Sequence, residues 1–459
     1  MRKGLNIKTD LTVGDPLKVT VLFALPIFIS NILQQLYNLT DMSIIGHALG
    51  DDALSAIGSV SVIYNMFNSL LFGMGNGISI VISRYFGAND IKGLKKAVAN
   101  TFFLAVGWII LITTIATTTL KPLMKLLNTQ EELTDAAYSY VIIMLSLIVF
   151  PFTYNILSGL LRAIGNSIAP LVFLVISVTT NIGLDLLFVV GLGKGLPGAA
   201  FATVISQALC SLVCFIYIVK FVPELHFGKE DFKPNRGMIA DLFAQGISFG
   251  LMFMVVNMGT VILQSAINGF GKTTIAAHAT ARKISELCMM SLSTLATAMS
   301  TFSGQNFGAG RYDRIKEGLR KVLFCGFGIA SFLIVVIYTF GEHLVRLISG
   351  SSNANLISTA VFYLKVDLPF YYVLAVIVIT RCVLQGMGAK IVPLIASIME
   401  LVTKIITASW LAHVLGYTGI AICEPITWSI CALYIVIVFI RRIKVLDTAD
   451  KDLHSVSDS

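Results

Sequence analysis

Twelve long apolar segments dominate the sequence and limit the folds that it can adopt. Each is near or above the roughly 20 residues that an α-helix needs to cross a bilayer. In lipid a segment of this length must satisfy its own backbone hydrogen bonds, so each one is predicted to be a helix. The segments lie at 17–45, 54–82, 97–119, 136–161, 168–190 and 197–221, and again at 239–268, 275–303, 319–340, 356–380, 391–413 and 418–440. An all-α membrane protein is therefore expected.

Composition and charge placement agree with a multi-pass membrane protein. Hydrophobic residues make up 56% of the chain and charged residues only 13%, far from the balance of a soluble domain. The net charge of +8 does not indicate nucleic-acid binding, because Lys and Arg lie in short loops between the apolar segments. Most of them fall in alternate loops, together with both termini. The positive-inside rule then predicts a plasma-membrane protein with both termini cytoplasmic.

The two halves of the sequence resemble each other. The stretch ISRYFGANDIKGLKKAV at 82–98 is similar to FSGQNFGAGRYDRIKEGLRKV at 302–322, and LLRAIGNSIAPL at 160–171 aligns with VLQGMGAKIVPL at 383–394. Six helices per half give both halves the same orientation, a parallel repeat around the membrane normal. The predicted parts are an N-terminal lobe at 1–221, a cytoplasmic linker at 222–236, a C-terminal lobe at 237–440 and a polar tail without regular structure at 441–459.

Asp41 is an isolated acid within the first apolar segment. A charged residue at the centre of a membrane helix costs roughly 2.5 to 3.5 kcal/mol, so its carboxyl is expected to be protonated, to bind a cation or to face water. Asn31, Gln34, Asn38 and Asp41 recur at helical spacing and share one face. That face is predicted to line a cavity, and a polar stripe that joins neighbouring helices is the alternative. Substrate-lining candidates are Gln34, Tyr37, Asn38 and Met66.

The second half has membrane acids of its own, at Glu286, Glu400 and Glu424. They are candidates for a second cation or substrate site. Basic residues lie one helical turn from two of them: Arg282 precedes Glu286 and Lys404 follows Glu400. Ion pairs along one helix face are therefore the alternative for these two acids.

Several of these stretches together resemble the multidrug and toxic compound extrusion (MATE) family. They are ALPIFISNILQQLYNLTDMSIIG at 24–46, ISRYFGA at 82–88, TNIGLDLLF at 180–188, GAAFATVISQ at 198–207 and SGQNFGAGR at 303–311. The resemblance implies twelve helices in two pseudo-symmetric six-helix lobes. It also implies an antiporter that exports small amphipathic or cationic drugs in exchange for sodium ions or protons, with no cofactor.

The resemblance also implies a cation site in the N-terminal lobe. It consists of Asp41 on the first helix, Asn181 and Asp185 on the fifth and Thr203 on the sixth, which would be the sodium ligands in a sodium-coupled protein. Their chemistry is suitable, because carboxylate, amide and hydroxyl oxygens are the ligands of hard cations, and the acids could bind a proton instead. The NorM branch has a glutamate on the seventh helix where this chain has apolar Val256, so the chain is closer to the DinF-like side.

Other functions receive less support from the sequence. An enzyme would need a nucleophile with a base, or a metal cluster, and no such pattern is present. A lipid-linked oligosaccharide flippase, the alternative of similar architecture, would favour a strongly basic cavity, and a channel or receptor is a third option. Expected partners are small drug-like molecules and membrane lipid, without nucleic acid, and the protein is expected to be a monomer.

Overall fold

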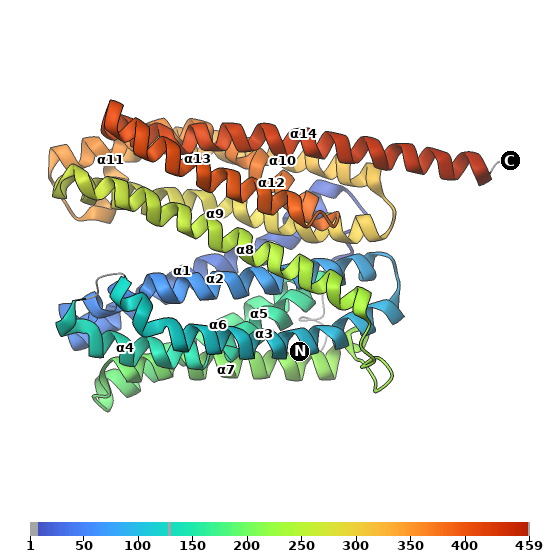
Figure 1. Cartoon of the computed structure of the whole chain (residues 1–459), viewed down its shortest axis with the longest axis horizontal. Coiled ribbons are helices and arrows are strands. Elements are labelled where there is room, and N and C mark those ends of the chain that lie inside the picture. The colour runs from blue at the N-terminus through green and yellow to red at the C-terminus, as the bar shows by residue number, and fades with distance from the viewer. Residues whose placement is uncertain (1–7, 127–129, 458–459) are drawn as a thin grey trace. The chain divides into compact units, whose positions relative to one another are not determined.

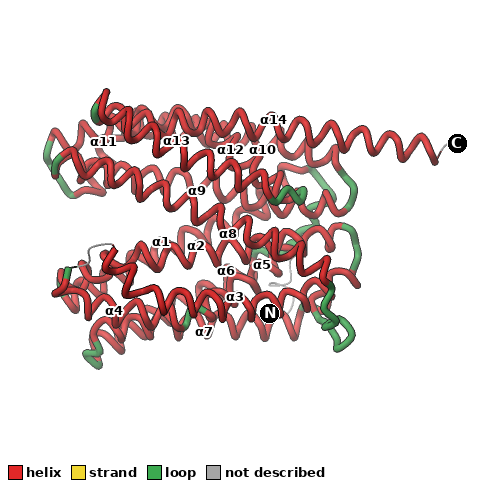
Figure 2. The backbone as a smooth tube through the Cα atoms, viewed as in Figure 1, coloured by secondary structure: helices red, strands yellow, loops and turns green. Residues whose placement is uncertain are grey.

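The computed structural model describes residues 8–126 and 130–457, and helices account for nearly all of them (Figures 1 and 2). The first seven helices are α1 (Pro16–Leu49), α2 (Asp51–Gly87), α3 (Ile91–Leu126), α4 (Glu131–Ser146), α5 (Val149–Ala163), α6 (Ile168–Asp185) and α7 (Gly195–Phe221). The other seven are α8 (Arg236–Ile267), α9 (Lys272–Gly308), α10 (Tyr312–Ser349), α11 (Ala354–Asp367), α12 (Tyr371–Gly386), α13 (Ile391–Leu415) and α14 (Tyr417–Ser457). The prediction of an all-α protein is confirmed.

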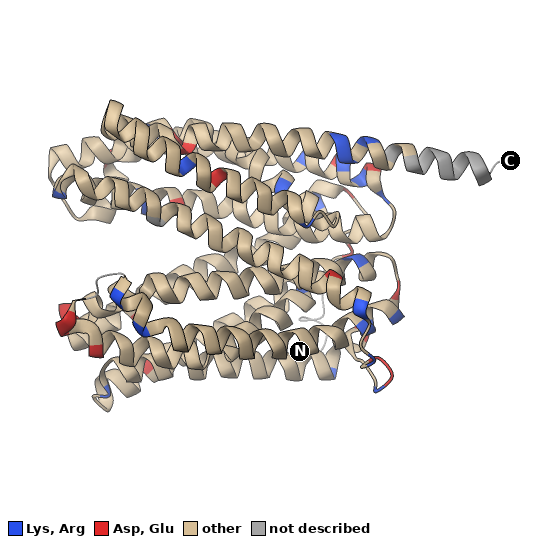
Figure 3. Cartoon of the chain, in the orientation of Figure 1, with Lys and Arg blue, Asp and Glu red and all other residues tan. Residues whose placement is uncertain are grey.

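The helices have the length and composition of membrane spans. Within the described residues, ten helical segments are long and apolar enough to cross a bilayer, and the bent pair α4 and α5 makes eleven. The remaining predicted span, at 275–303, lies in α9, which has 37 residues. Charged residues gather mainly at helix ends and connections, which leaves most of each helix length apolar (Figure 3).

Two predicted spans are interrupted at a proline. The segment 136–161 was predicted as one helix, but α4 ends at Ser146, α5 begins at Val149 and the two are bent by 43°. Pro151 lacks an N–H, and in a continuous helix its ring would clash with the carbonyl of Leu147, so the helix breaks before it. Pro369 lies in the short 3₁₀ turn η4 (Leu368–Phe370) between α11 and α12. The first break comes directly before the stretch FPFTY at 150–154, and the second falls within the similar stretch LPFYY at 368–372.

The chain forms two compact units. The first contains Leu25–Met254 and the described residues before Leu11, and the second contains Leu11–Ala24 and the described residues from Val255 onward. The change between units thus falls inside α8, beyond the expected linker at 222–236. In the first unit α2 packs against α4 and α5, and α7 against α5 and α6 (Figure 1). In the second, α9 packs against α10, α11 and α12, and α13 against α14.

Glycines allow α2 and α8 to approach closely inside the first unit. A Cβ at Gly77 would lie 2.4 Å from the carbonyl oxygen of Gln245, and one at Gly73 would lie 2.6 Å from Cα of Gly250. Only a residue without a side chain fits these two positions, which is the usual role of small residues where membrane helices cross.

The prediction of a tail without regular structure was wrong. The helix α14 continues through the polar residues after Arg441 as far as Ser457. Helix already formed at Tyr417 extends without a new nucleation step, and the tail contains neither Pro nor Gly to stop it.

Candidate functional site

The four predicted cation ligands lie on three helices of the first unit. Asp41 is on α1, Asn181 and Asp185 are one turn apart on α6, and Thr203 is on α7. Asn181 and Asp185 are fully buried, and Thr203 is 8% exposed. Asp185 is the last residue of α6, directly before a π-helical turn at Leu186–Gly191. Such turns occur often at functional sites.

The side chains of Asp41 and Asp185 meet. The carboxyl of Asp185 is in contact with the carboxyl of Asp41 and with the amide of Asn181. These contacts lack hydrogen-bond geometry: Asp41 Oδ1, both carboxyl oxygens of Asp185 and both polar atoms of Asn181 are buried without a partner among residues 8–126 and 130–457. No Lys or Arg of the described chain lies within 4.0 Å of either carboxyl. The pair therefore lacks a resident counter-charge.

A carboxyl pair of this kind needs a positive charge or a proton. Two ionised carboxylates in contact repel each other, and burial removes the water that would stabilise them. A group buried without hydrogen bonds costs about 1 to 3 kcal/mol, and more when it is charged. The unused oxygens of Asp41, Asp185 and Asn181 could bind a small cation, or the two carboxyls could share a proton.

Aromatic hydroxyls surround the carboxyl pair. Tyr37 donates a hydrogen bond to Thr203 Oγ1 at 3.4 Å and, like Tyr140 on α4, lies near enough to Asp41 and Asp185 to interact with their charges. Tyr140 was not among the predicted site residues. A tyrosine in an apolar run is ordinarily read as packing, so only the fold reveals this neighbour.

A cavity of about 460 Å³ adjoins the pair inside the first unit. Its walls come from α1, α2, α4, α5, α6 and α7, and both Asp41 and Thr203 line it. The volume falls in the range of sites for drug-sized ligands. The lining mixes tyrosines, amides and hydroxyls with apolar residues, among them Tyr64, Asn68 and Phe72.

The predicted substrate-lining residues have different positions. Gln34, Tyr37 and Asn38 are among the lining residues of the cavity. Met66 instead packs against the apolar core of the first unit, on the same helix as Tyr64 and Asn68, which do line the cavity. Helical spacing explains the difference, because Met66 lies about 200° around α2 from Tyr64 and from Asn68.

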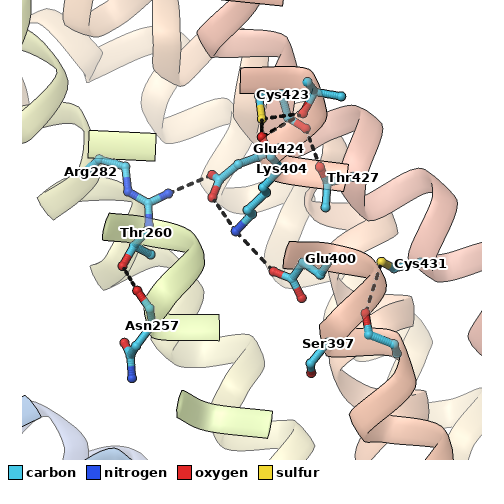
Figure 4. Close-up of polar contacts among 12 residues, drawn as sticks. Asn257, Thr260, Arg282, Ser397, Glu400, Lys404, Cys423, Glu424, Thr427 and Cys431 are labelled. Atoms are coloured by element: carbon cyan, nitrogen blue, oxygen red, sulfur yellow. Dashed lines mark hydrogen bonds and ion pairs between the residues drawn. The ribbon is translucent and has the colours of Figure 1, made fainter. Parts of the chain in front are cut away.

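In the second unit, two of the three predicted acids belong to a buried ion-pair network (Figure 4). Glu424 accepts from Arg282 at 2.7 Å and from Tyr363 at 3.0 Å, and Lys404 lies 3.3 Å from Glu424 and 3.2 Å from Glu400. The pair that the sequence suggested between Glu400 and Lys404 is thus present. The ion pair that the sequence suggested between Arg282 and Glu286 is absent from the described residues, because Arg282 pairs with Glu424 instead.

The third predicted acid, Glu286, and one further acid, Asp367, have different surroundings. Glu286 is exposed on α9 and forms no ion pair with the part of the chain that the structure describes. Asp367 at the end of α11 is fully buried and accepts from Ser285 at 3.3 Å, near Glu424 and Arg282. Asp367 was not among the predicted site residues. Its position inside the apolar segment 356–380 was a signal, although it is less isolated than Asp41 because Lys365 lies two residues before it.

The internal repeat shows that the two halves differ at the site. The alignment of Pro170 with Pro393 places Lys404 opposite Asn181 and Ala408 opposite Asp185. The second unit therefore has an ammonium group where the first has an amide, and no acid where the first has Asp185. No group of three or more His, Cys, Asp or Glu side chains able to hold a metal lies within the described residues. A cation in the first unit would thus depend on amide and hydroxyl oxygens as well.

Comparisons with known proteins agree with this architecture. The sequence matches the family model described as MatE over residues 26–187 and 249–410. It is 28% identical over 85% of the chain to the probable multidrug resistance protein YpnP of Bacillus subtilis, covering 87% of that protein. It is 25% identical over 94% of the chain to the multidrug export protein MepA of Staphylococcus saprophyticus, covering 94% of that protein.

A solved structure extends the likeness over nearly the whole chain. It is the outward-facing conformation of a multidrug resistance MATE family transporter of the MOP superfamily, at 25% identity. The TM-score is 0.89, with 97% of this chain and 99% of that one covered, which confirms the predicted fold of twelve helices in two lobes. The two matched halves of the family model and this shared fold show that the chain belongs to the MatE family, a family of membrane transporters and not of enzymes.

Proposed function

We propose that this protein is a secondary antiporter that exports small amphipathic or cationic drugs in exchange for sodium ions or protons. The observation that carries the proposal is the carboxyl pair of Asp41 and Asp185, which has no counter-charge among the described residues and lies next to a cavity of drug size, with Asp185 fully buried and Asp41 partly buried. The names of the relatives YpnP and MepA refer to multidrug resistance and export, which supports drug-like substrates for this chain too.

The coupling follows from the position of Asp41. This residue belongs both to the carboxyl pair and to the cavity wall. A sodium ion or proton that neutralises the pair changes the charge of the wall that the exported compound meets. A cationic compound would therefore bind best when the ion has left, and ion entry would favour its release. Asn181 and Thr203 complete the shell if the ion is sodium.

The orientation and the alternative function are also part of the proposal. The excess of Lys and Arg in alternate loops favours cytoplasmic termini in the plasma membrane. A lipid-linked oligosaccharide flippase would need several basic groups for its diphosphate, whereas Arg162 alone among the described cavity-lining residues is basic. The cavity thus favours the drug antiporter over the flippase.

The test is drug efflux from vesicles with a sodium gradient and a pH gradient imposed separately. One of the two gradients is expected to drive uphill transport in the unmodified protein, and Asp41→Asn is expected to abolish that transport while the protein still inserts. Asp52→Asn, which changes an exposed acid of α2, is the matched control and is expected to transport normally. Full gradient-driven efflux by Asp41→Asn would refute the assignment.

A further inference from the structure

Arg162 on α5 lines the cavity of the first unit without an acidic partner. Its guanidinium donates only a long hydrogen bond, 3.4 Å to Asn76 Oδ1, and no carboxylate of the described chain lies within 4.0 Å of it. The buried cations of the second unit behave differently. Arg282 pairs with Glu424, and Lys404 with both Glu400 and Glu424. Arg162 thus holds its positive charge at the cavity with its hydrogen-bonding capacity mostly unused.

The guanidinium and the carboxyl pair lie toward opposite ends of the first unit's α6. Arg162 is in the last turn of α5, directly before the connection to α6, and Asp185 is the final residue of α6. The 18 residues of α6 are about 27 Å long. Asp41 meets Asp185 at the far end. The cavity is therefore acidic at one end and basic at the other.

The repeat shows that the turn after α5 does not itself need an arginine. Arg162 in LLRAIG aligns with Gln385 in VLQGMG, and Gln385 is 1% exposed in the equivalent turn of the second unit. A neutral amide thus fits this local structure. The carbonyls at the end of α5 also favour a cation at this position.

We propose that Arg162 binds the carboxylate of an exported amphipathic compound, so that the cavity accepts zwitterions and not only cations. This inference rests on the proposed export function. A guanidinium presents a planar fork of donors that matches a carboxylate in two hydrogen bonds, and partial burial strengthens such bonds. Asn155 and Ser158 lie on the same face of α5 as Arg162 and also line the cavity, so they extend the polar surface around the bound carboxylate.

The test compares two dyes that differ only in the carboxylate, rhodamine B and its ethyl ester. Their binding to the purified full-length protein is measured by fluorescence anisotropy, for the unmodified protein, Arg162→Gln and Arg162→Lys. Arg162→Gln copies the residue of the repeat, so it is expected to fold. It should weaken binding of rhodamine B about tenfold, the loss of one charge-assisted pair, and change binding of the ester less than twofold. Arg162→Lys keeps the charge and should recover part of the affinity.

The outcomes separate this inference from the proposed function. If Arg162→Gln weakens binding of both dyes equally, Arg162 maintains the shape of the cavity. If Arg162→Gln leaves binding of rhodamine B unchanged, or if the unmodified protein does not bind rhodamine B, Arg162 is not a carboxylate site. Each of these results overturns the inference. If Arg162→Gln weakens binding of rhodamine B and not of its ester, but the vesicles show no gradient-driven efflux, the carboxylate site is supported and only the proposed export function is contradicted.

Discussion

The ion-pair network of the second unit allows a stability prediction in which the magnitude follows from the contacts. Glu424 has a side chain only 3% exposed, and it faces Arg282 at 2.7 Å and Lys404 at 3.3 Å. Glu424→Gln keeps the size of the side chain but removes the negative charge between two cations. Lys404 still has Glu400 at 3.2 Å, whereas Arg282 loses its ion-pair partner. Breaking one side of a buried pair typically lowers the free energy of unfolding by about 3 to 5 kcal/mol.

The double variant isolates the pairwise part of this cost. Replacing Arg282 with Gln as well removes the uncompensated cation, so Arg282→Gln with Glu424→Gln should be less destabilised than the sum of the two single variants. The expected coupling is at least about 1 kcal/mol. Glu286→Gln changes an exposed acid of α9 without an ion pair and should stay within about 0.5 kcal/mol of the unmodified protein.

The assay is unfolding in mixed micelles of dodecyl maltoside and increasing sodium dodecyl sulfate, followed by tryptophan fluorescence. The free energy of unfolding is compared at one micelle composition for the unmodified protein, the two single variants, the double variant and the Glu286→Gln control. If Glu424→Gln is no less stable than Glu286→Gln, or if the single costs simply add, the network does not hold these helices together and the reasoning is wrong.

Two further predictions concern other parts of the chain. Lys321 hydrogen-bonds Asp15 and holds the pKa of that carboxyl below its ordinary value near 3.9, so the contact stabilises the fold above that pH and is lost as the pH falls through the lower folded value. The melting temperature of Asp15→Asn should therefore fall less than that of the unmodified protein between pH 5 and about pH 3, and equal falls would contradict this. Gly77→Ala places a Cβ 2.4 Å from a backbone oxygen of α8 and should cost about 1 to 3 kcal/mol of stability, measured in the same micelles. Gly58→Ala, with open space around it on the same helix, is the control, and equal effects of the two would show that α2 and α8 are not in close contact.

The sequence predicts the helices well because their length is set by the bilayer. The apolar segment at 168–190 corresponds to α6 with its π-helical turn, which together cover Ile168–Gly191. The break at Pro151 was not predicted, since an apolar run remains apolar whether or not the helix within it is continuous. A pattern of hydrophobicity does not detect the missing N–H of proline, which is what interrupts the helix.

The candidate site is predictable in part. Helical spacing alone places Asn181 and Asp185 on one face, but the contact between Asp185 and Asp41 depends on how α1 and α6 pack, which spacing does not determine. In the same way Arg282 could be paired with Glu286 from the sequence, four residues away, whereas the structure pairs it with Glu424, 142 residues away. Helical spacing identifies possible ion-pair partners on one helix, but tertiary packing determines whether a residue pairs there or with a residue of another helix.

The replacement of Asn181 by Lys404 and of Asp185 by Ala408 across the repeat means that the two halves are no longer interchangeable. A chimaera built from two first halves would contain two such pockets of uncompensated negative charge, while one built from two second halves would contain fixed ammonium groups and no such pocket. The two halves share one scaffold, but only the first combines two contacting carboxyls with no basic partner among the described residues, so ion coupling is expected to depend on that half alone.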